Sequence, residues 1–146
     1  MAFKQITSSF SAAPQLTQDD LAAAAKAQGR VITPETDSER GLFYRADHFS
    51  VARRGVPALQ LMALGGASDM KDGGRPAGQK WLDAYMACYH KDCDQIGPDW
   101  NLAGVAEDVA LFHAIGAKLA NSRTWPEWKP SSEFGPLRAQ SKAQRR

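Results

Sequence analysis

His90 is the residue of this chain best suited to chemistry. It follows Tyr89 directly and is followed by two carboxylates, Asp92 and Asp94. A neutral imidazole is the commonest zinc ligand, and a nearby carboxylate can orient its other nitrogen. Asp94 is therefore a candidate orienting or loop-fixing group. A lone histidine is not a metal site, and on the pattern alone a partly exposed turn residue is the favoured interpretation of His90.

A second histidine, His48, lies at the start of a short helix that we expect over residues 48–54. Asp47 precedes it and suits the N-cap, and Gly55 ends the helix. His48 could be a ligand or a proton carrier. Because Asp47 is better explained as the cap, a structural hydrogen bond at the helix start is the favoured role of His48.

The two cysteines, Cys88 and Cys93, flank His90. They could pair across a short turn, although sequence cannot supply the required geometry. A zinc cluster of both cysteines with His90 is a weaker alternative, because this spacing matches no common structural zinc pattern. The chain has no G-x-S-x-G nucleophile elbow, no P-loop and no G-x-G-x-x-G.

The composition is that of an ordinary globular domain. The chain has 146 residues, 43% of them hydrophobic and 23% charged, which suits one domain with a real core. A net charge of +2 is too small to indicate a nucleic-acid or membrane partner. Hydropathy predicts no membrane-spanning run and no signal peptide in this chain, and localisation stays open.

The elements that must position these residues follow from periodicity and caps. We expect helices over residues 17–27, 48–54, 79–86 and 102–119, the first capped by Thr17 and the last carrying apolar residues at three- and four-residue steps. The near-continuous apolar run 56–64 predicts a strand covered on both faces. A glycine-rich loop follows over 65–78, and the segment 125–134 reads as an ordered strap that packs back on the domain.

These elements divide the chain into three parts. Residues 1–15 are mixed and polar and are expected to form a loose leader, residues 16–134 form the domain, and residues 135–146 form a basic tail that we expect to be disordered. One strong strand cannot make a sheet. The chain therefore has the character of the edge of an α/β domain whose other strands lie elsewhere.

Three segments together resemble a known family. They are Tyr44-Arg-Ala-Asp-His-Phe-Ser-Val-Ala-Arg-Arg-Gly-Val-Pro-Ala-Leu59, then Tyr89-His-Lys-Asp-Cys-Asp-Gln-Ile-Gly-Pro-Asp-Trp-Asn-Leu-Ala-Gly104, then Trp125-Pro-Glu-Trp-Lys-Pro-Ser-Ser-Glu-Phe134. Their order is similar to the C-terminal portion of the co-catalytic zinc aminopeptidases, peptidase family M28, which includes bacterial leucyl aminopeptidase and is related in fold to glutaminyl cyclase. The similarity runs from about residue 16 to about residue 134.

The resemblance implies an α/β fold of three layers, αβα, of which this chain holds the C-terminal part of the sheet and its flanking helices. It also implies two zinc ions held by two histidines, two aspartates and a glutamate, with a further glutamate as general base. The last histidine ligand matches His90. Asp47 and His48 match a site-shaping Asp-His element, and Tyr44 and Arg45 before it could reach a peptide substrate.

The departures from the family matter as much. No Glu-Glu pair occurs, and the family's first ligand motif, a histidine and an aspartate separated by one residue, has no match upstream of these segments. The resemblance thus carries over one ligand and no base, so we expect no catalysis by this chain alone. Parent enzymes of this type are usually exported.

Three hypotheses remain. The favoured one is a C-terminal fragment of a metallo-aminopeptidase, completed by an upstream region and carrying exposed apolar surface on the 56–64 strand. The second is a non-catalytic binding or association domain on the same scaffold, with homo-association completing the sheet. The third is acyl transfer of the glutaminyl cyclase type, which fits less well.

Overall fold

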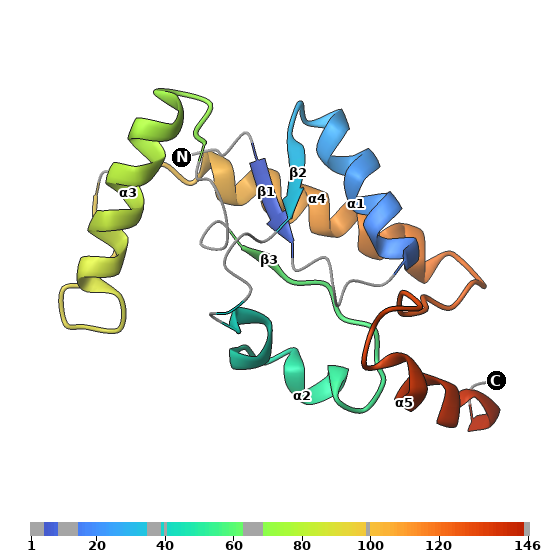
Figure 1. The fold of residues 1–146 in the computed structure, drawn as a ribbon. Coiled ribbons are helices and arrows are strands. Elements are labelled where there is room, and N and C mark those ends of the chain that lie inside the picture. The colour runs from blue at the N-terminus through green and yellow to red at the C-terminus, as the bar shows by residue number, and fades with distance from the viewer. Residues whose placement is uncertain are drawn as a thin grey trace.

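The computed structural model describes residues 5–8, 15–34, 39, 41–62, 69–98 and 100–144 (Figure 1). In chain order the elements are β1 (Gln5–Ser8), α1 (Gln15–Ala27), β2 (Val31–Pro34), the 3-10 turn η2 (Leu42–Arg45), α2 (Phe49–Ala52), β3 (Leu61–Met62), α3 (Gly74–Cys88), α4 (Ala103–Ala120), α5 (Gly135–Gln140) and η3 (Lys142–Gln144). The described part of the chain is mostly helical with a small sheet. Among these residues no helix is both long enough and apolar enough to cross a bilayer.

The sheet has three strands in the order β2-β1-β3. β1 pairs in parallel with β2, from Gln5 opposite Val31 to Ser8 opposite Pro34, and α1 forms the connection between them. β3 adds to the other edge of β1 in the antiparallel sense, with Thr7 opposite Met62. The prediction of a loose leader over residues 1–15 is therefore wrong for residues 5–8. Four residues of mixed polarity carry no periodic signal, although their backbone groups pair on both sides.

Helix α1 begins two residues before the expected cap, Thr17, and ends as expected at Gly29. The chain reverses there with Gly29 at φ 67°, and the Arg30 amide donates to the Ala25 carbonyl at 2.8 Å. A bond of this span together with a left-handed glycine is the Schellman ending of a helix. It turns the chain directly into β2, and it places Arg30 against α4.

The first core cluster lies between α1, α4 and the strands. Leu21 and Ala25 of α1 pack against Leu111 and Ile115 of α4, and all four are buried. Ile32, Leu59 and Leu61 pack against this cluster from the strand side. Figure 1 shows α4 passing behind the sheet and beside α1. These two helices form one layer on the sheet.

The second core cluster gathers segments far apart in sequence. Phe43, Ala52, Trp128 and Phe134 are buried together. The Trp128 indole donates to the Gly55 carbonyl at 3.0 Å, so the strap 125–134 does pack back on the domain as predicted. α5 and η3 continue from it, and Arg138 is buried. The predicted disordered tail is therefore wrong for residues 135–144, because ring packing and Arg138 contacts fix a segment that composition marks as solvated.

Three local predictions also need correction. The run 56–64 forms a strand only at Leu61–Met62, Val56 is exposed, and residues 63–68 lie outside the described part. α3 starts at Gly74, inside the predicted loop 65–78, and residues 79–86 form only its second half. α2 has His48 as N-cap with no side-chain cap bond, so Asp47 does not cap it as predicted.

Helix α4 confirms the predicted position, and only part of its periodic apolar sequence is buried. Leu111 and Ile115 are buried, whereas Leu102, Val105, Val109 and Phe112 are all exposed, Val109 to 62%. We call these four residues the α4 apolar face. Their spacing is that of a helix side made for packing, and in the described structure this side faces outward.

Candidate functional site

The loop after α3 presents His90. α3 ends at Cys88, and Cys88 and Cys93 form a disulfide that closes the loop over His90. His90 has φ 57°, in the left-handed region that non-glycine residues seldom adopt. The Asp94 carboxylate accepts a long hydrogen bond of 3.4 Å from the His90 backbone N–H. Asp94 thus contacts the backbone of the loop and not the imidazole, which corresponds to the loop-fixing role.

The imidazole of His90 ends a row of aromatic rings along one side of α3. Trp81 and Tyr85 stack at 5.3 Å between centroids, Tyr85 lies 5.2 Å from Tyr89, and Tyr89 lies 4.0 Å from His90. Steps of four residues place successive rings on one helix side. Burial raises the pKa of Tyr85, with smaller contributions from Tyr89 and Asp94. His90 itself is exposed, so its ring is accessible to a metal or a substrate.

A cavity of about 450 Å³ lies between α3, this loop and the start of α4. Its aromatic wall consists of Trp81 and Tyr85 from α3 and Trp100 from the segment before α4. Both disulfide cysteines and Asp94 also line it, whereas His90 does not. The cavity therefore borders the loop that holds His90.

Arg30 forms the charged part of the cavity wall. It is buried at the end of α1 and makes an ion pair of 2.6 Å with Asp108 of α4, which also lines the cavity. One guanidinium N–H bonds the Gln28 side chain at 3.2 Å. The Arg30 Nε is buried without a hydrogen-bond partner in the described structure. Such a donor costs free energy until an acceptor reaches it.

The other predicted site residues lie in and around η2 and the start of α2, and we call them the second group: Tyr44, Arg45, Asp47 and His48. Two of them, Tyr44 and His48, contact Phe43 of the second core cluster. The Tyr44 hydroxyl donates a short hydrogen bond to the Glu133 carboxylate, which is the leading cause of the raised pKa of Tyr44. The His48 ring packs edge-on against Phe43 at 4.4 Å. Burial lowers the pKa of His48, partly offset by its hydrogen bond to the Phe43 carbonyl and by Asp47. Asp47 and Arg45 are exposed.

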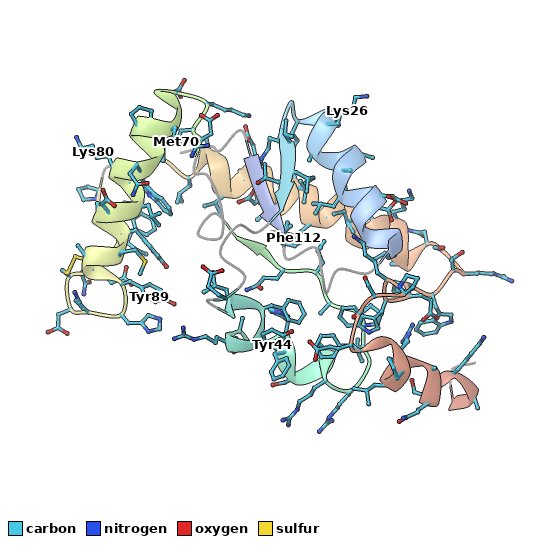
Figure 2. All side chains as sticks on the ribbon, in the orientation of Figure 1. Lys26, Tyr44, Met70, Lys80, Tyr89 and Phe112 are labelled. Carbon is cyan, nitrogen blue, oxygen red and sulfur yellow. A yellow bond between two sulfur atoms is a disulfide. The ribbon has the colours of Figure 1, made fainter. Side chains whose placement is uncertain are left out.

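The structure thus brings His90 and Asp94 together but does not bring them to the second group. No hydrogen bond, ion pair or ring contact between described residues joins the His90 loop to Tyr44, Asp47 or His48. Figure 2 shows Tyr89 at the end of α3 and Tyr44 in a different part of the fold. The contacts of Tyr44 and His48 are those of residues that hold η2, α2 and the strap together.

The described residues do not fit a complete zinc site. No group of three or more histidine, cysteine, aspartate or glutamate side chains among them could hold a metal ion. Cys88 and Cys93 are joined to each other, so neither can act as a thiolate, and the alternative zinc cluster with His90 is wrong. His90 alone offers one nitrogen where a protein-bound zinc ion takes three or four side-chain ligands.

Comparison with protein families identifies the chain. The model of Peptidase family M28 matches residues 3–114, which is most of the 146-residue chain. The chain belongs to peptidase family M28, as the resemblance indicated. The match begins at residue 3, so the expected leader is family sequence, and it ends at residue 114 where the resemblance was drawn to about 134. Neither a curated protein nor a solved structure matches this chain.

Sequence reasoning did not single out the cavity. The four-residue step from Trp81 through Tyr85 to Tyr89 was a usable signal, because it continues without a break into His90. Arg30 gave no signal, since its place depends on how α1 packs against α4.

Proposed function

We propose that this chain is the C-terminal part of a metallo-aminopeptidase that removes N-terminal residues from peptides, and that His90 is one of its zinc ligands. Membership of peptidase family M28 supports a peptidase-related function. The presentation of His90 carries the rest of the proposal. Its exposed ring is held on a disulfide-closed loop, in a backbone conformation that costs free energy, beside a cavity. Such cost is often found where a side chain must be aimed.

The proposal needs further ligands and a general base from outside this chain. Two zinc ions shared by His90 and upstream residues, on a three-layer αβα fold, form the complete site that we propose. The isolated chain is then inactive in hydrolysis. The exposed α4 apolar face supports this, because exposed apolar side chains at helical spacing commonly mark an interaction surface.

The roles of the second group are narrower in this proposal. Asp94 fixes the His90 loop. Tyr44 and His48 are already engaged with Glu133 and Phe43, so we assign them to holding η2, α2 and the strap together, away from the His90 loop. Arg45 and Asp47 are exposed and stay available to a peptide.

Hydrolysis of leucine p-nitroanilide by the natural protein, isolated from its source, tests the proposal. We expect activity that is lost on chelation and restored by zinc, and no activity from the 146-residue chain with zinc. His90→Ala in the natural protein should abolish hydrolysis and lower the bound zinc. His113→Ala is the matched control, because His113 is exposed on α4, and it should change neither. Full activity of the His90 variant would refute the assignment.

The α4 apolar face also favours a second candidate, a non-catalytic association domain on the same scaffold. It predicts a stable oligomer of the chain itself and no hydrolysis by the natural protein with any metal. An assay of the natural protein also distinguishes acyl transfer of the glutaminyl cyclase type. That activity would cyclise N-terminal glutamine and would not hydrolyse peptides.

A further inference from the structure

We propose that the Cys88–Cys93 disulfide is a redox switch for the loop that presents His90. In the oxidised chain the bridge holds the loop and aims the imidazole, and in the reduced chain the loop relaxes and the imidazole leaves that position. The inference rests on the proposed function, because it names a regulation of the proposed peptidase site. It is carried by the position of the bridge, the backbone strain at His90 and the accessibility of the bridge.

The bridge closes a tight loop around His90. Cys88 is the last residue of α3, Cys93 follows five positions later, and their Cα atoms lie 5.3 Å apart. The loop also contains hydrogen bonds between exposed residues. The Asp94 amide donates to the Lys91 carbonyl at 2.9 Å, and the Asp94 carboxylate accepts from the His90 amide at a long 3.4 Å. Water competes for such bonds, so the disulfide is the strongest constraint on the loop.

The backbone of His90 supplies the strain that such a switch needs. His90 has φ 57°, and among the described residues other than glycine only His90 has a positive φ. This left-handed conformation costs free energy in a residue with a Cβ, so it persists only while the surrounding structure imposes it. Opening the bridge therefore favours a return of His90 to negative φ. That rotation redirects the side chain and takes the imidazole off the Tyr89 ring, now 4.0 Å away between centroids.

The bridge is accessible to a reductant. Cys93 is exposed, Cys88 is half-buried, and both line the cavity beside the loop. Exposed disulfides exchange with external thiols more readily than buried ones. The chain has two cysteines in all, so no third thiol of the chain can rearrange the bridge. Reduction and oxidation therefore interconvert two defined states of the loop.

The effect of the switch is local to the loop. The hydrogen bonds that the structure shows for residues 89–95 run within residues 85–95. The Tyr89 amide, for example, donates to the Tyr85 carbonyl at 2.8 Å, and the Lys91 ammonium donates to the Ala87 carbonyl at 2.7 Å. Neither of the two core clusters described above includes a residue of this loop. Opening the bridge should therefore leave both clusters intact.

A dithiol is a reductant that balances the step. Its thiolate attacks one sulfur of the bridge, the Sγ–Sγ bond breaks, and a mixed disulfide forms. The second thiolate of the reductant then closes the reductant's own disulfide and releases the chain. Cys88 and Cys93 gain two electrons and two protons, and the dithiol loses the same. The loop is then open in a compartment that keeps thiols reduced and closed in an oxidising one.

NMR of the metal-free 146-residue chain, in buffers of reduced and oxidised dithiothreitol at stepped ratios, tests the switch. A strong cross-peak between the amide and Hα protons of His90 reports its positive φ. We expect this cross-peak in the oxidised chain and its loss in the reduced chain. The ratio at which half of it is lost should equal the ratio at which half of the cysteines react with iodoacetamide. A reduced chain that keeps His90 at positive φ would overturn the proposal.

Two control signals separate a local switch from a general loss of structure. The Trp128 indole N–H, which donates to the Gly55 carbonyl at 3.0 Å, should keep its signal in the reduced chain. The ring of His113, exposed on α4, should also be unaffected. Loss of the Trp128 signal together with the His90 change would show that the bridge supports the whole fold, and would overturn the proposal. The double variant Cys88→Ser, Cys93→Ser should show the reduced pattern in every buffer.

The natural protein connects the switch to the proposed function. Reduction should lower hydrolysis of leucine p-nitroanilide at least about tenfold and oxidation should restore it, since groups that orient a metal ligand are worth about 10–100-fold. The double serine variant should show the low rate without any reductant. Hydrolysis that reduction leaves unchanged would refute the switch alone. No hydrolysis in either state, with the His90 change intact, would refute the peptidase proposal and uphold the switch of the loop.

Discussion

The second core cluster and the α3–α4 side of this molecule contain similar side chains in opposite circumstances. In the cluster, Trp128 and Phe134 are buried, with 5.0 Å between their ring centroids. The Trp128 indole N–H donates a hydrogen bond to the Gly55 carbonyl. On the α3–α4 side, Trp100 and the α4 apolar face are exposed. The same types of side chain are therefore buried in one region and exposed to solvent in the other.

The difference lies in the number of segments that meet. The cluster is built from η2, α2 and the strap, so its buried rings have neighbours from several segments. The α3–α4 side is built by one helix, one closed loop and the start of another helix. It holds the exposed His90, the cavity and the apolar face. We call the second core cluster the complete region, and its contacts hold the fold together. We call the α3–α4 side the open region, and it is where we place the peptidase function.

Trp128→Ala should have the largest effect on stability and tests the complete region. It removes a buried ring and leaves the Gly55 carbonyl without its donor. We expect a loss of about 3–5 kcal/mol in the free energy of unfolding, measured by urea denaturation. Trp125→Ala, on an exposed indole, should cost under about 1 kcal/mol. Similar losses from both variants would contradict the contrast in burial.

Gly55→Ala should have the next largest effect on the stability of the chain. Gly55 has φ 81°, and an added Cβ would lie 2.6 Å from the Arg138 backbone N. Left-handed strain and overpacking together predict a loss of about 2–5 kcal/mol in thermal or chemical unfolding. Gly29→Ala is the matched control, because Gly29 has φ 67° but no atom within 4 Å of the added Cβ. Gly29→Ala should lower the free energy of unfolding by the backbone strain alone, about 1–2 kcal/mol.

The two sides of α4 provide the third comparison. Leu111→Ala removes a side chain that is 1% exposed and should cost about 3 kcal/mol. Val109→Ala, at 62% exposure, should change the stability of the chain by less than about 0.5 kcal/mol. If the proposed upstream part of the peptidase covers this face, Val109→Ala should become costly in the natural protein. If Val109→Ala changed the stability of the natural protein by equally little, no segment of that protein would cover the α4 apolar face.

Reduction of the disulfide should have a moderate effect confined to the open region. Cys88 and Cys93 close a short loop, and chain entropy for that length predicts a stabilisation of about 2 kcal/mol. The double serine variant should lose about that much, and NMR shifts should change around His90 and leave the Trp128 ring unaffected. Widespread shifts in the second cluster would show that the two regions are coupled.

The smallest expected effect is a pH dependence from His48 at the edge of the complete region. Because burial lowers its pKa below the usual 6.5, the unfolded chain binds more protons than the folded chain below that pH. The stability linked to neutral His48 is full above pH 6.5 and falls as the pH drops through the lowered pKa. His48→Gln should flatten the stability profile below pH 6.5. A profile that this variant leaves unchanged would contradict the assignment to His48.

The same contrast explains what could be predicted from the sequence. α4 and the stop of α1 at Gly29 were predictable, because periodicity and a glycine act locally. β1 was not, since its four residues gain order only by pairing with β2 and β3. The order of α5 was not predictable, because composition marks the segment as solvated and gives no sign that the Arg138 side chain contacts the Pro126 carbonyl and Glu127.

The candidate site was predictable only in part. The sequence marks His90 and Asp94 as candidate residues, and their roles stay predictions. It leaves open whether Cys88 and Cys93 pair, which the structure shows. The grouping of Tyr44, Arg45, Asp47 and His48 with a substrate came from the resemblance, and the structure places Tyr44 and His48 in contacts of the second cluster. The cavity requires Arg30, which is 58 residues from Cys88 along the chain and has no pattern that links it to α3.

Peptide mapping of the natural protein by mass spectrometry tests the central claim most directly. If the open region is the unfinished part of a peptidase site, peptides encoded upstream of Met1 should be present, and they should contain a histidine–aspartate motif and a glutamate pair. A natural protein that begins at Met1 and binds no zinc would contradict the account, and the cavity and the α4 apolar face would then need another explanation.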